Sequence, residues 1–193
     1  MVYIQDAPES FTDYMYRREL SKVSDQRRKA AEGFLRVQDR IRSVLSYRLL
    51  QYGLNCEYRI DEAPEFIFNE YGKPFLKDYP QIYFSLSHCE KAVACAIGES
   101  PVGIDIETLR PFDAELAEYV CSREEFAAIS ASPEPEVAFT VLWTKKESLC
   151  KMLGTGLPSK EELRQILHSP FRASFETTVN KAAGYVVSTI FKI

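Results

Sequence analysis

Residues 102–107 read Val102-Gly103-Ile104-Asp105-Ile106-Glu107, and they set the arrangement expected for the rest of the chain. Apolar residues alternate with other residues here, which is the period-two pattern of a half-buried strand. Asp105 and Glu107 then project together from the opposite face of that strand. Two such carboxylates repel each other unless a cation lies between them, and oxygen ligands of this kind suit Mg²⁺. Gly103 weakens the strand unless another segment must approach its backbone closely.

A second stretch, residues 143–151, reads Trp143-Thr144-Lys145-Lys146-Glu147-Ser148-Leu149-Cys150-Lys151 and predicts a helix. Trp143, Glu147 and Lys151 recur every four residues, which puts them on one helical face. That face can offer a third carboxylate and an ammonium group to the two strand carboxylates. Each pattern alone also has a plainer interpretation: a D-x-E strand edge is usually solvated, and a Glu–Lys pair often only stabilises a helix surface.

The composition is that of an ordinary globular protein. The chain has 193 residues, 46% of them hydrophobic and 27% charged, which is enough for one domain or two small lobes. The formal net charge of −4 does not favour nucleic acid as a partner. Because no early apolar run is long enough for a signal peptide or a membrane span, we expect a cytoplasmic protein without a membrane partner.

The cysteines indicate reduced thiols rather than a disulfide framework. They are five in number, lack a C-x-x-C pair and lie at positions 56, 89, 95, 121 and 150. An odd number of cysteines without an export signal fits a cytosolic protein. Zinc is not expected, because the two histidines, His88 and His168, do not lie at metal-finger spacing from the cysteines.

Helical and strand patterns occur in both halves of the chain. A long amphipathic helical region is expected over 24–50 with a break near Gly33, and another over 137–153, which Gly154 ends after a loop at 130–136. Shorter helices are expected at 10–19, 111–119, 122–129 and within 157–167. Strands are expected at 1–5, 65–68, 82–86 and 91–97, with a closing hairpin of 171–178 and 185–192. Helices packed on antiparallel sheet in both halves predict an α+β fold, although identity between the halves is too weak to demonstrate duplication.

Three further features are candidates for binding. Residues 27–48 are locally basic, as either a solvated helix face with snorkelling arginines or a cradle for a polyanion such as phosphate. Lys73 lies between Gly72 and Pro74, where a rigid turn could hold its ammonium in place. Ser87 and His88 end a strand; taken alone, the histidine is more often structural, and the serine lacks a G-x-S-x-G context.

Taken together and in this order, the motifs resemble the 4′-phosphopantetheinyl transferases. The resemblance is to the larger, monomeric type that activates peptide synthetases and is named for the surfactin system. It extends from about Ser24 to Leu157, and each motif is weak alone but specific in combination. The matching residues are Gly72-Lys73-Pro74, Phe84-Ser85-Leu86-Ser87-His88, Gly103-Ile104-Asp105-Ile106-Glu107, Trp143-x-x-Lys146-Glu147-Ser148-x-x-Lys151 and Gly154-x-Gly156-Leu157.

The resemblance implies two similar α+β lobes related by a pseudo-twofold axis, with the active site in the cleft between them. Residues 1–100 would form the lobe that binds coenzyme A, and residues 101–193 the lobe with the metal-binding carboxylates and the catalytic helix. The implied reaction is attack by a serine hydroxyl of an apo acyl or peptidyl carrier protein on the β-phosphate of coenzyme A. The products are the phosphopantetheinylated carrier and 3′,5′-ADP, and the enzyme would act as a monomer.

The resemblance also implies a role for each group at the reaction centre. Asp105, Glu107 and Glu147 would hold Mg²⁺ on the pyrophosphate, and Lys151 would neutralise charge as 3′,5′-ADP departs. Glu147 would act as general base for the serine, directly or through a metal-bound water. The sequence does not decide between Glu147 and Glu107 for that role, or between Mg²⁺ and Mn²⁺.

By the same resemblance, five residues would contact coenzyme A. His88 and Ser87 match positions that touch the 3′-phosphate and the pyrophosphate, and Lys73 matches a contact on the adenine and phosphate side. Arg42 aligns with an arginine that helps to bind the 3′-phosphate, and Arg27 falls near another basic position of that pocket.

Two other functions remain as alternatives. The first is a non-catalytic module that binds coenzyme A or a carrier protein on the same fold, which the presence of all four catalytic groups disfavours. The second is another Mg²⁺-dependent phosphoryl-transfer enzyme, although the sequence contains no G-x-x-x-x-G-K-[ST] loop. Residues 111–126 are the expected docking segment for the carrier, which could serve fatty-acid, polyketide or peptide synthesis.

Overall fold

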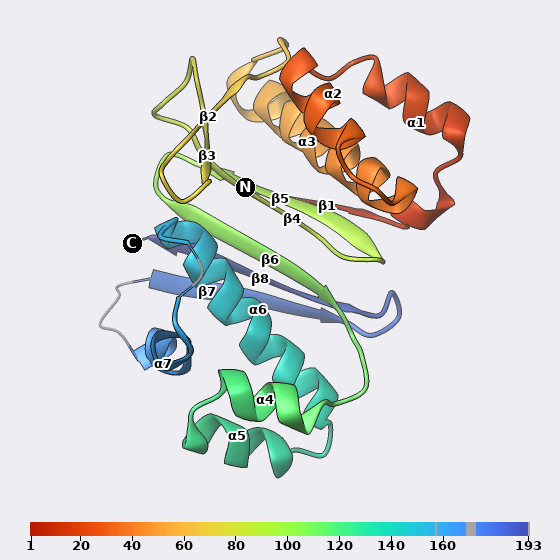
Figure 1. Ribbon diagram of the computed structural model, residues 1–193. Coiled ribbons are helices and arrows are strands. Elements are labelled where there is room, and N and C mark those ends of the chain that lie inside the picture. The colour runs from red at the N-terminus through yellow and green to blue at the C-terminus, as the bar shows by residue number, and fades with distance from the viewer. Residues whose placement is uncertain (157, 169–172, 193) are drawn as a thin grey trace.

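The computed structural model describes residues 1–156, 158–168 and 173–192 (Figure 1). Helices and small antiparallel sheets alternate along the chain, so the expected mixture of helix and sheet is confirmed. No helix in these three ranges is both long and apolar enough to cross a membrane.

Two three-stranded antiparallel sheets form the centre of the molecule. The first joins, in this order, β1 (Val2–Asp6), β5 (Ala92–Gly98) and β4 (Tyr83–His88). The second joins β6 (Val102–Thr108), β8 (Tyr185–Lys192) and β7 (Ala173–Asn180). A separate hairpin pairs β2 (Phe66–Phe68) with β3 (Pro74–Leu76), so the chain after Lys73 enters a short strand.

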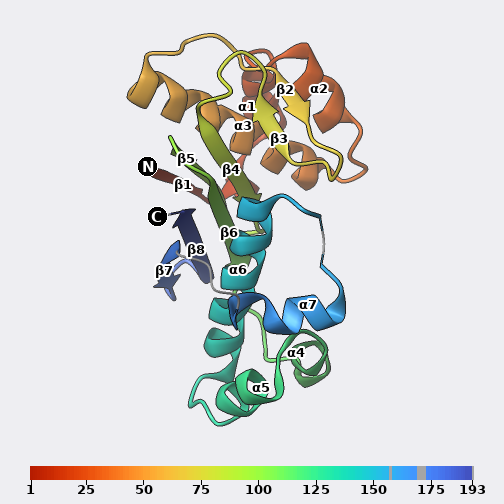
Figure 2. The ribbon, with the colours of Figure 1, turned by 90° about the vertical axis from the view of Figure 1, so that its left-hand side faces the viewer.

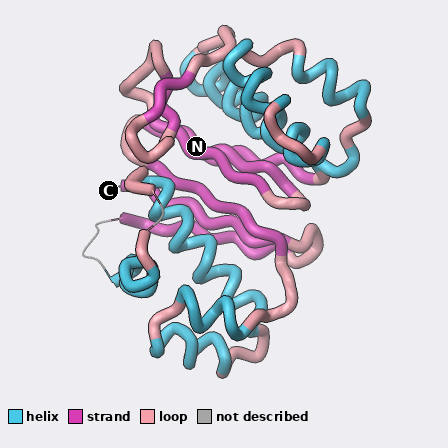
Figure 3. The backbone as a smooth tube through the Cα atoms, in the orientation of Figure 1, coloured by secondary structure: helices cyan, strands magenta, loops and turns pink. Residues whose placement is uncertain are grey.

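Helices cover one side of each sheet (Figures 1 and 3). The helices beside the first sheet are α1 (Asp13–Leu20), α2 (Asp25–Glu32) and α3 (Val37–Tyr58). Those of the second half are α4 (Ala114–Val120), α5 (Arg123–Ser130), α6 (Pro135–Leu153) and α7 (Lys160–Gln165). Single 3₁₀ turns lie at Pro8–Ser10 and Ile166–His168. α3 packs on β4 and β5, and α6 packs on β6 and β8.

Most of the expected elements are present, with small shifts at their ends. The break near Gly33 is confirmed, since α2 ends and α3 begins on either side of it. α6 begins at Pro135 rather than Val137, because proline is well suited to the first turn of a helix. Gly154 ends α6 with a left-handed φ of 66°. The closing hairpin is confirmed over β7 and β8, whereas residues 171–172 of the expected strand lie outside the described residues.

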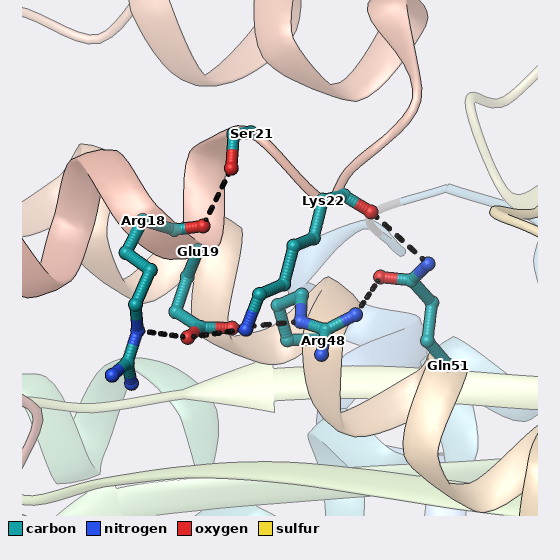
Figure 4. Close-up of polar contacts among 6 residues, drawn as sticks. All are labelled: Arg18, Glu19, Ser21, Lys22, Arg48 and Gln51. Carbon is teal, nitrogen blue, oxygen red and sulfur yellow. Dashed lines mark hydrogen bonds and ion pairs between the residues drawn. The ribbon is translucent and has the colours of Figure 1, made fainter.

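Part of the basic stretch serves to join helices rather than to bind a ligand. The Glu19 carboxylate of α1 is mostly buried and accepts hydrogen bonds from Arg18, Lys22 and Arg48, each at 3.0 Å (Figure 4). Arg48 also donates to Gln51, which donates in turn to the Lys22 carbonyl. Although burial opposes it, these hydrogen bonds lower the pKa of Glu19. The Arg48 guanidinium therefore has a structural role, because its hydrogen bond to Glu19 holds α1 against α3.

The two sheets meet where β4 lies beside β6 (Figure 2). Side chains make this connection, because the two strands belong to different hydrogen-bonded sheets. The Ser85 hydroxyl accepts from the Ile104 backbone N–H at 3.1 Å, and the Ser87 hydroxyl accepts from the Ile106 N–H at 3.3 Å. Two buried serines thus fix β6, and with it the carboxylates that β6 carries, against the end of β4.

Gly103 allows α6 to lie directly on β6. A Cβ atom at position 103 would be 1.9 Å from the Ser148 carbonyl oxygen and 2.8 Å from the Met152 nitrogen. Both atoms belong to the α6 backbone, which cannot move aside as the end of a flexible side chain can. A glycine in this strand was expected only if another segment approaches its backbone closely. That segment is α6, the helix that carries Glu147 and Lys151.

We expect Gly103→Ala to lower the free energy of unfolding by about 1–3 kcal/mol or more, since overpacking a close contact has an effect of that size. The measurement is chemical denaturation of the variant and the wild type. Gly98→Ala is the control, because the nearest atom to its added Cβ would be 3.7 Å away. Equal stability of the Gly103 variant and the wild type would contradict the proposed packing of α6 on β6.

Candidate active site

A cavity of about 350 Å³ opens where β4, β6 and α6 converge. The structure brings most of the predicted site residues together in its wall. These are Arg27, Ser87, His88, Asp105, Glu107, Glu147 and Lys151. Lys73 lines an adjoining, more apolar cavity that shares Glu147 and Lys151, and Arg42 lines a smaller one that shares His88 and Glu107.

Asp105 is the buried centre of this site, with only 3% of its surface exposed. Its Oδ1 accepts hydrogen bonds from the Ser87 hydroxyl at 2.8 Å and from the Lys151 ammonium at 2.5 Å. Lys151 also donates to the Ser87 hydroxyl at 2.9 Å, so the three side chains form a closed triangle. The other oxygen, Oδ2, is buried without a hydrogen-bond partner among the described residues. A buried carboxylate oxygen of this kind needs a cation or another donor.

The two glutamates of the site share an unfavourable environment for negative charge. Burial, and then the charge of Asp105, raise the pKa of Glu107 to about 7, although the Lys151 ammonium opposes the shift. Burial and the charge of Asp105 also raise the pKa of Glu147. One ammonium, that of Lys151, faces three carboxyl groups. A further positive charge would therefore be electrostatically favourable in the site.

The carboxylates suit a hard divalent cation by their chemistry. No three acidic, histidine or cysteine side chains in the described parts of the chain are already gathered into a metal cluster. Nevertheless, the buried Oδ2 of Asp105 has no partner, and Glu107 and Glu147 line the same cavity. All three offer oxygen atoms, which Mg²⁺ and Mn²⁺ prefer. These three residues are thus the ones that could hold a metal ion.

Positive groups lie on the other side of the cavity. Burial, followed by the charges of Arg42 and Lys151, lowers the pKa of His88, as expected of a histidine placed among cations. Arg42 pairs with Asp39 at 2.6 Å, which holds its guanidinium beside the site. Asp39 was not identified from the sequence, although its position three residues before Arg42 on a helix was a usable signal.

Arg27 is placed differently from a simple surface cation. Its guanidinium carbon lies 5.3 Å from the ring centres of both Tyr47 and Phe66, and it donates to the Ser43 hydroxyl at 3.2 Å. Burial lowers its pKa, and its Nε has no partner in the described chain. Arg27 is therefore fixed by aromatic packing at the cavity wall.

Lys73 and Lys146 direct their ammonium groups into protein rather than into the cavity. The Lys73 Nζ donates to the Lys151 and Met152 carbonyls, both at 2.7 Å. Its expected contact with coenzyme A stays a prediction. Lys146 is completely buried and uses all three donors, on the Glu125 carboxylate at 2.7 Å and on two backbone carbonyls at 2.9 Å. This structural role of Lys146 was not predicted from the sequence, because its partners lie on distant segments of the chain.

Comparison with known proteins gives a consistent result. A family model described as the 4′-phosphopantetheinyl transferase superfamily matches residues 101–188. The 4′-phosphopantetheinyl transferase Sfp of Bacillus subtilis is 31% identical over 86% of this chain and 76% of its own length. The 4′-phosphopantetheinyl transferase gsp of Aneurinibacillus migulanus is 36% identical over 71% of this chain and 58% of its own. AcpT of Salmonella typhimurium, also a 4′-phosphopantetheinyl transferase, is 38% identical over 49% of this chain and 52% of its own.

We expect the Glu107→Gln variant to be more stable than the wild type in the absence of metal, by an amount that increases as the pH rises. The raised pKa of Glu107, about 7, means that the folded state keeps a proton that the unfolded state loses near its ordinary value of about 4.3. The stabilisation from this proton is complete at low pH and is lost as the pH rises through about 7. Allowing for solvent screening, the effect is about 1–2 kcal/mol.

Thermal unfolding in EDTA measures this effect, and the difference in Tm between variant and wild type should grow from about pH 5 to about pH 8. Glu115→Gln, on the exposed surface of α4, is the control. Adding Mg²⁺ at the higher pH should stabilise the wild type more than the Glu107 variant. A Tm difference that does not change with pH would contradict the electrostatic description of the site.

Proposed function

The chain belongs to the 4′-phosphopantetheinyl transferase superfamily, and from this membership we propose that it transfers 4′-phosphopantetheine from coenzyme A to a serine of an apo carrier protein. The other product is 3′,5′-ADP. The observation that carries the proposal is the meeting of Asp105, Glu107, Glu147 and Lys151 in one cavity with His88. Three carboxylates and several cations together suit a reaction that breaks the P–O–P bond of a pyrophosphate.

Charge on the pyrophosphate of coenzyme A is the main obstacle to this reaction. The Lys151 ammonium would donate to a phosphate oxygen and neutralise the charge that develops on the departing 3′,5′-ADP. Its present bonds to Asp105 and Ser87 hold it at the cavity wall, ready for that contact. A divalent cation held by Asp105, Glu107 and Glu147 would supply Lewis-acid chemistry and further charge neutralisation at the pyrophosphate.

Glu147 is the proposed general base for the carrier serine. Burial raises its pKa, which lets its carboxylate accept a proton near neutral pH more readily than an exposed glutamate would. Glu107 lines the same cavity as Glu147 and is proposed as a ligand of the metal ion instead. The serine proton would pass to the Glu147 carboxylate as the serine oxygen forms its bond to the β-phosphate.

The cationic side of the cavity is proposed to bind the rest of coenzyme A. His88, Arg42 and Arg27 would bind the 3′-phosphate. Ser87 would donate to the pyrophosphate when its hydroxyl turns from Asp105, its present acceptor, to the substrate. After burial, the charges of Arg42 and Lys151 contribute most to lowering the pKa of His88. A phosphate bound there would offset this repulsion, which supports the assignment. The ionic pair of Arg42 with Asp39 supports it further, since it orients the guanidinium in advance.

The finer organisation of the fold is also a proposal. We infer two lobes, residues 1–100 and 101–193, related by a pseudo-twofold axis with the cavity between them. Each half contains a three-stranded antiparallel sheet with one long helix packed on it, α3 in the first and α6 in the second. Since one chain supplies both walls of the cavity, we expect the protein to act as a monomer. We also expect it to act in the cytoplasm, without nucleic acid or membrane as partners.

Intact mass spectrometry tests the proposed reaction. An apo carrier protein incubated with this protein, coenzyme A and Mg²⁺ should gain one phosphopantetheine, roughly 340 Da, and should not gain it in EDTA. No gain across acyl and peptidyl carriers, combined with coenzyme A binding by calorimetry, would indicate a binding module instead. No gain and no binding would contradict the proposal altogether.

Glu147→Gln should lower kcat by about 10²–10⁴-fold, the usual contribution of a general base, even at saturating Mg²⁺. Glu107→Gln should recover a larger share of its activity as Mg²⁺ is raised, because it loses a ligand rather than the base. Steady-state kinetics over a range of Mg²⁺ concentrations distinguishes the two. Full recovery of the Glu147 variant by metal would reverse the two assignments.

His88→Ala should weaken the binding of coenzyme A more than that of 3′-dephospho-coenzyme A, since only the former carries the phosphate that His88 would contact. The loss expected for one charge-assisted hydrogen bond is about tenfold or more in Kd. Isothermal titration with both ligands measures it. An equal loss for the two ligands would contradict the 3′-phosphate assignment.

A further inference from the structure

Side chains of the turn at residues 69–73 form hydrogen bonds with the end of α6, although more than 75 residues separate the two segments. Two hydrogen bonds run from the Lys73 ammonium to the Lys151 and Met152 carbonyls, each 2.7 Å long. A third runs from the Asn69 side-chain amide to the Gly154 carbonyl at 2.8 Å. Three carbonyls of the last helical turn and its cap are thus bonded by side chains from one distant turn.

The turn itself is rigid, so it can hold the helix end in a fixed place. The Asn69 side-chain oxygen accepts from the backbone N–H groups of Tyr71 and Lys73, at 3.0 and 2.8 Å. Gly72 adopts a positive φ of 82°, and Pro74 follows at the start of β3. The alkyl stem of Lys73 packs so closely on the helix end that a Cβ atom at position 154 would lie 2.3 Å from its Cδ.

The contact is chemically suited to a helix end. The last carbonyls of a helix have no partner within the helix and carry the negative end of its dipole, so a cation there is stabilising. Burial alone disfavours the ammonium and lowers the pKa of Lys73 to about 8. Two carbonyl acceptors offset that cost, because hydrogen bonds from a charged donor are stronger than neutral ones. Two of the three Lys73 donors are therefore used within the protein.

The residue held in this way is Lys151. Its carbonyl is bonded by Lys73, and its own ammonium is bonded to Asp105 and Ser87. We propose that the Lys73 ammonium has a positioning role: it acts on the reaction through Lys151 by fixing the last turn of α6. The role rests on the proposed function, because Lys151 is there the group that neutralises the departing phosphate.

The two possible roles of Lys73 differ in which kinetic constant they control. A direct contact with coenzyme A would exist in the ground state, so its loss would raise KM and the Kd of 3′,5′-ADP. A clamp on the helix end aligns Lys151 for charge that develops during reaction, so its loss would lower kcat and leave ligand affinity nearly unchanged. A misplacement of about 1 Å at such a group is worth about 100-fold in rate.

The test compares three variants of the full chain. Lys73→Met keeps the packed stem and removes the ammonium, and Asn69→Ala loosens the same turn without removing a charge. Lys77→Met is the matched control, because that lysine is exposed and pairs with Glu65 on the surface. For each variant we would measure kcat and KM for coenzyme A in transfer to an apo carrier, the Kd of 3′,5′-ADP, and hydrogen exchange of the α6 amides.

Lys73→Met should lower kcat by about tenfold to 100-fold while the Kd of 3′,5′-ADP changes by less than about threefold. Asn69→Ala should lower kcat in the same direction by a smaller factor, and Lys77→Met should match the wild type. Hydrogen exchange should quicken at the last turn of α6 in the first two variants only. A Lys73 variant with normal kcat and a Kd raised about tenfold or more would overturn the proposal.

Hydrogen exchange keeps the inference separate from the proposed function. If the wild type transferred nothing, the proposed function would fail, but faster exchange in the Lys73 and Asn69 variants would still establish the clamp. If the wild type were active and exchange at the end of α6 were the same in all variants, the clamp would be refuted while the function stood. Circular dichroism of each variant checks that it has folded.

Discussion

The buried carboxylate of Asp105 is the constraint to which the rest of this structure is fitted. It lies on β6 at the meeting of the two sheets, with Ser87 of β4 on one side and Lys151 of α6 on the other. A carboxylate buried to this degree is unfavourable unless other groups satisfy it. Its two partners come from segments that precede and follow it in sequence, so satisfying Asp105 also brings together the three elements that form the cavity.

The packing around β6 follows from this requirement. Gly103 lets the α6 backbone approach β6, and buried alanines of β5 leave space for the apolar side chains on the other face of the strand. Ser85 and Ser87 of β4 accept hydrogen bonds from the β6 backbone and so connect the two sheets. Small side chains at these positions are therefore as much a part of the active site as the charged ones, because they determine how closely its walls approach.

Much of this arrangement could be predicted from the sequence, and the reason is local. Alternation over 102–107 and the four-residue spacing of Trp143, Glu147 and Lys151 are properties of single elements, so both elements could be predicted. The prediction that the strand is half-buried is wrong, because the segments packed on β6 bury both of its faces from Val102 to Ile106. The contacts of Lys73 and of the buried Lys146 could not be predicted in the same way. Their partners lie 78 and 21 residues away, and no local pattern specifies such a contact. Both lysines stand within recognisable motifs, but the motifs do not say what their ammonium groups touch.

Titration of Mn²⁺ into the protein, followed by electron paramagnetic resonance, tests most directly whether the three carboxylates form a metal site. The wild type should bind one Mn²⁺ per chain, and binding should tighten when coenzyme A is present. Asp105→Asn keeps the shape and the acceptor oxygen of this side chain but removes its charge, and it should abolish that binding while the protein remains folded. Equal Mn²⁺ binding by the wild type and the Asp105 variant would contradict the central role of the buried carboxylate.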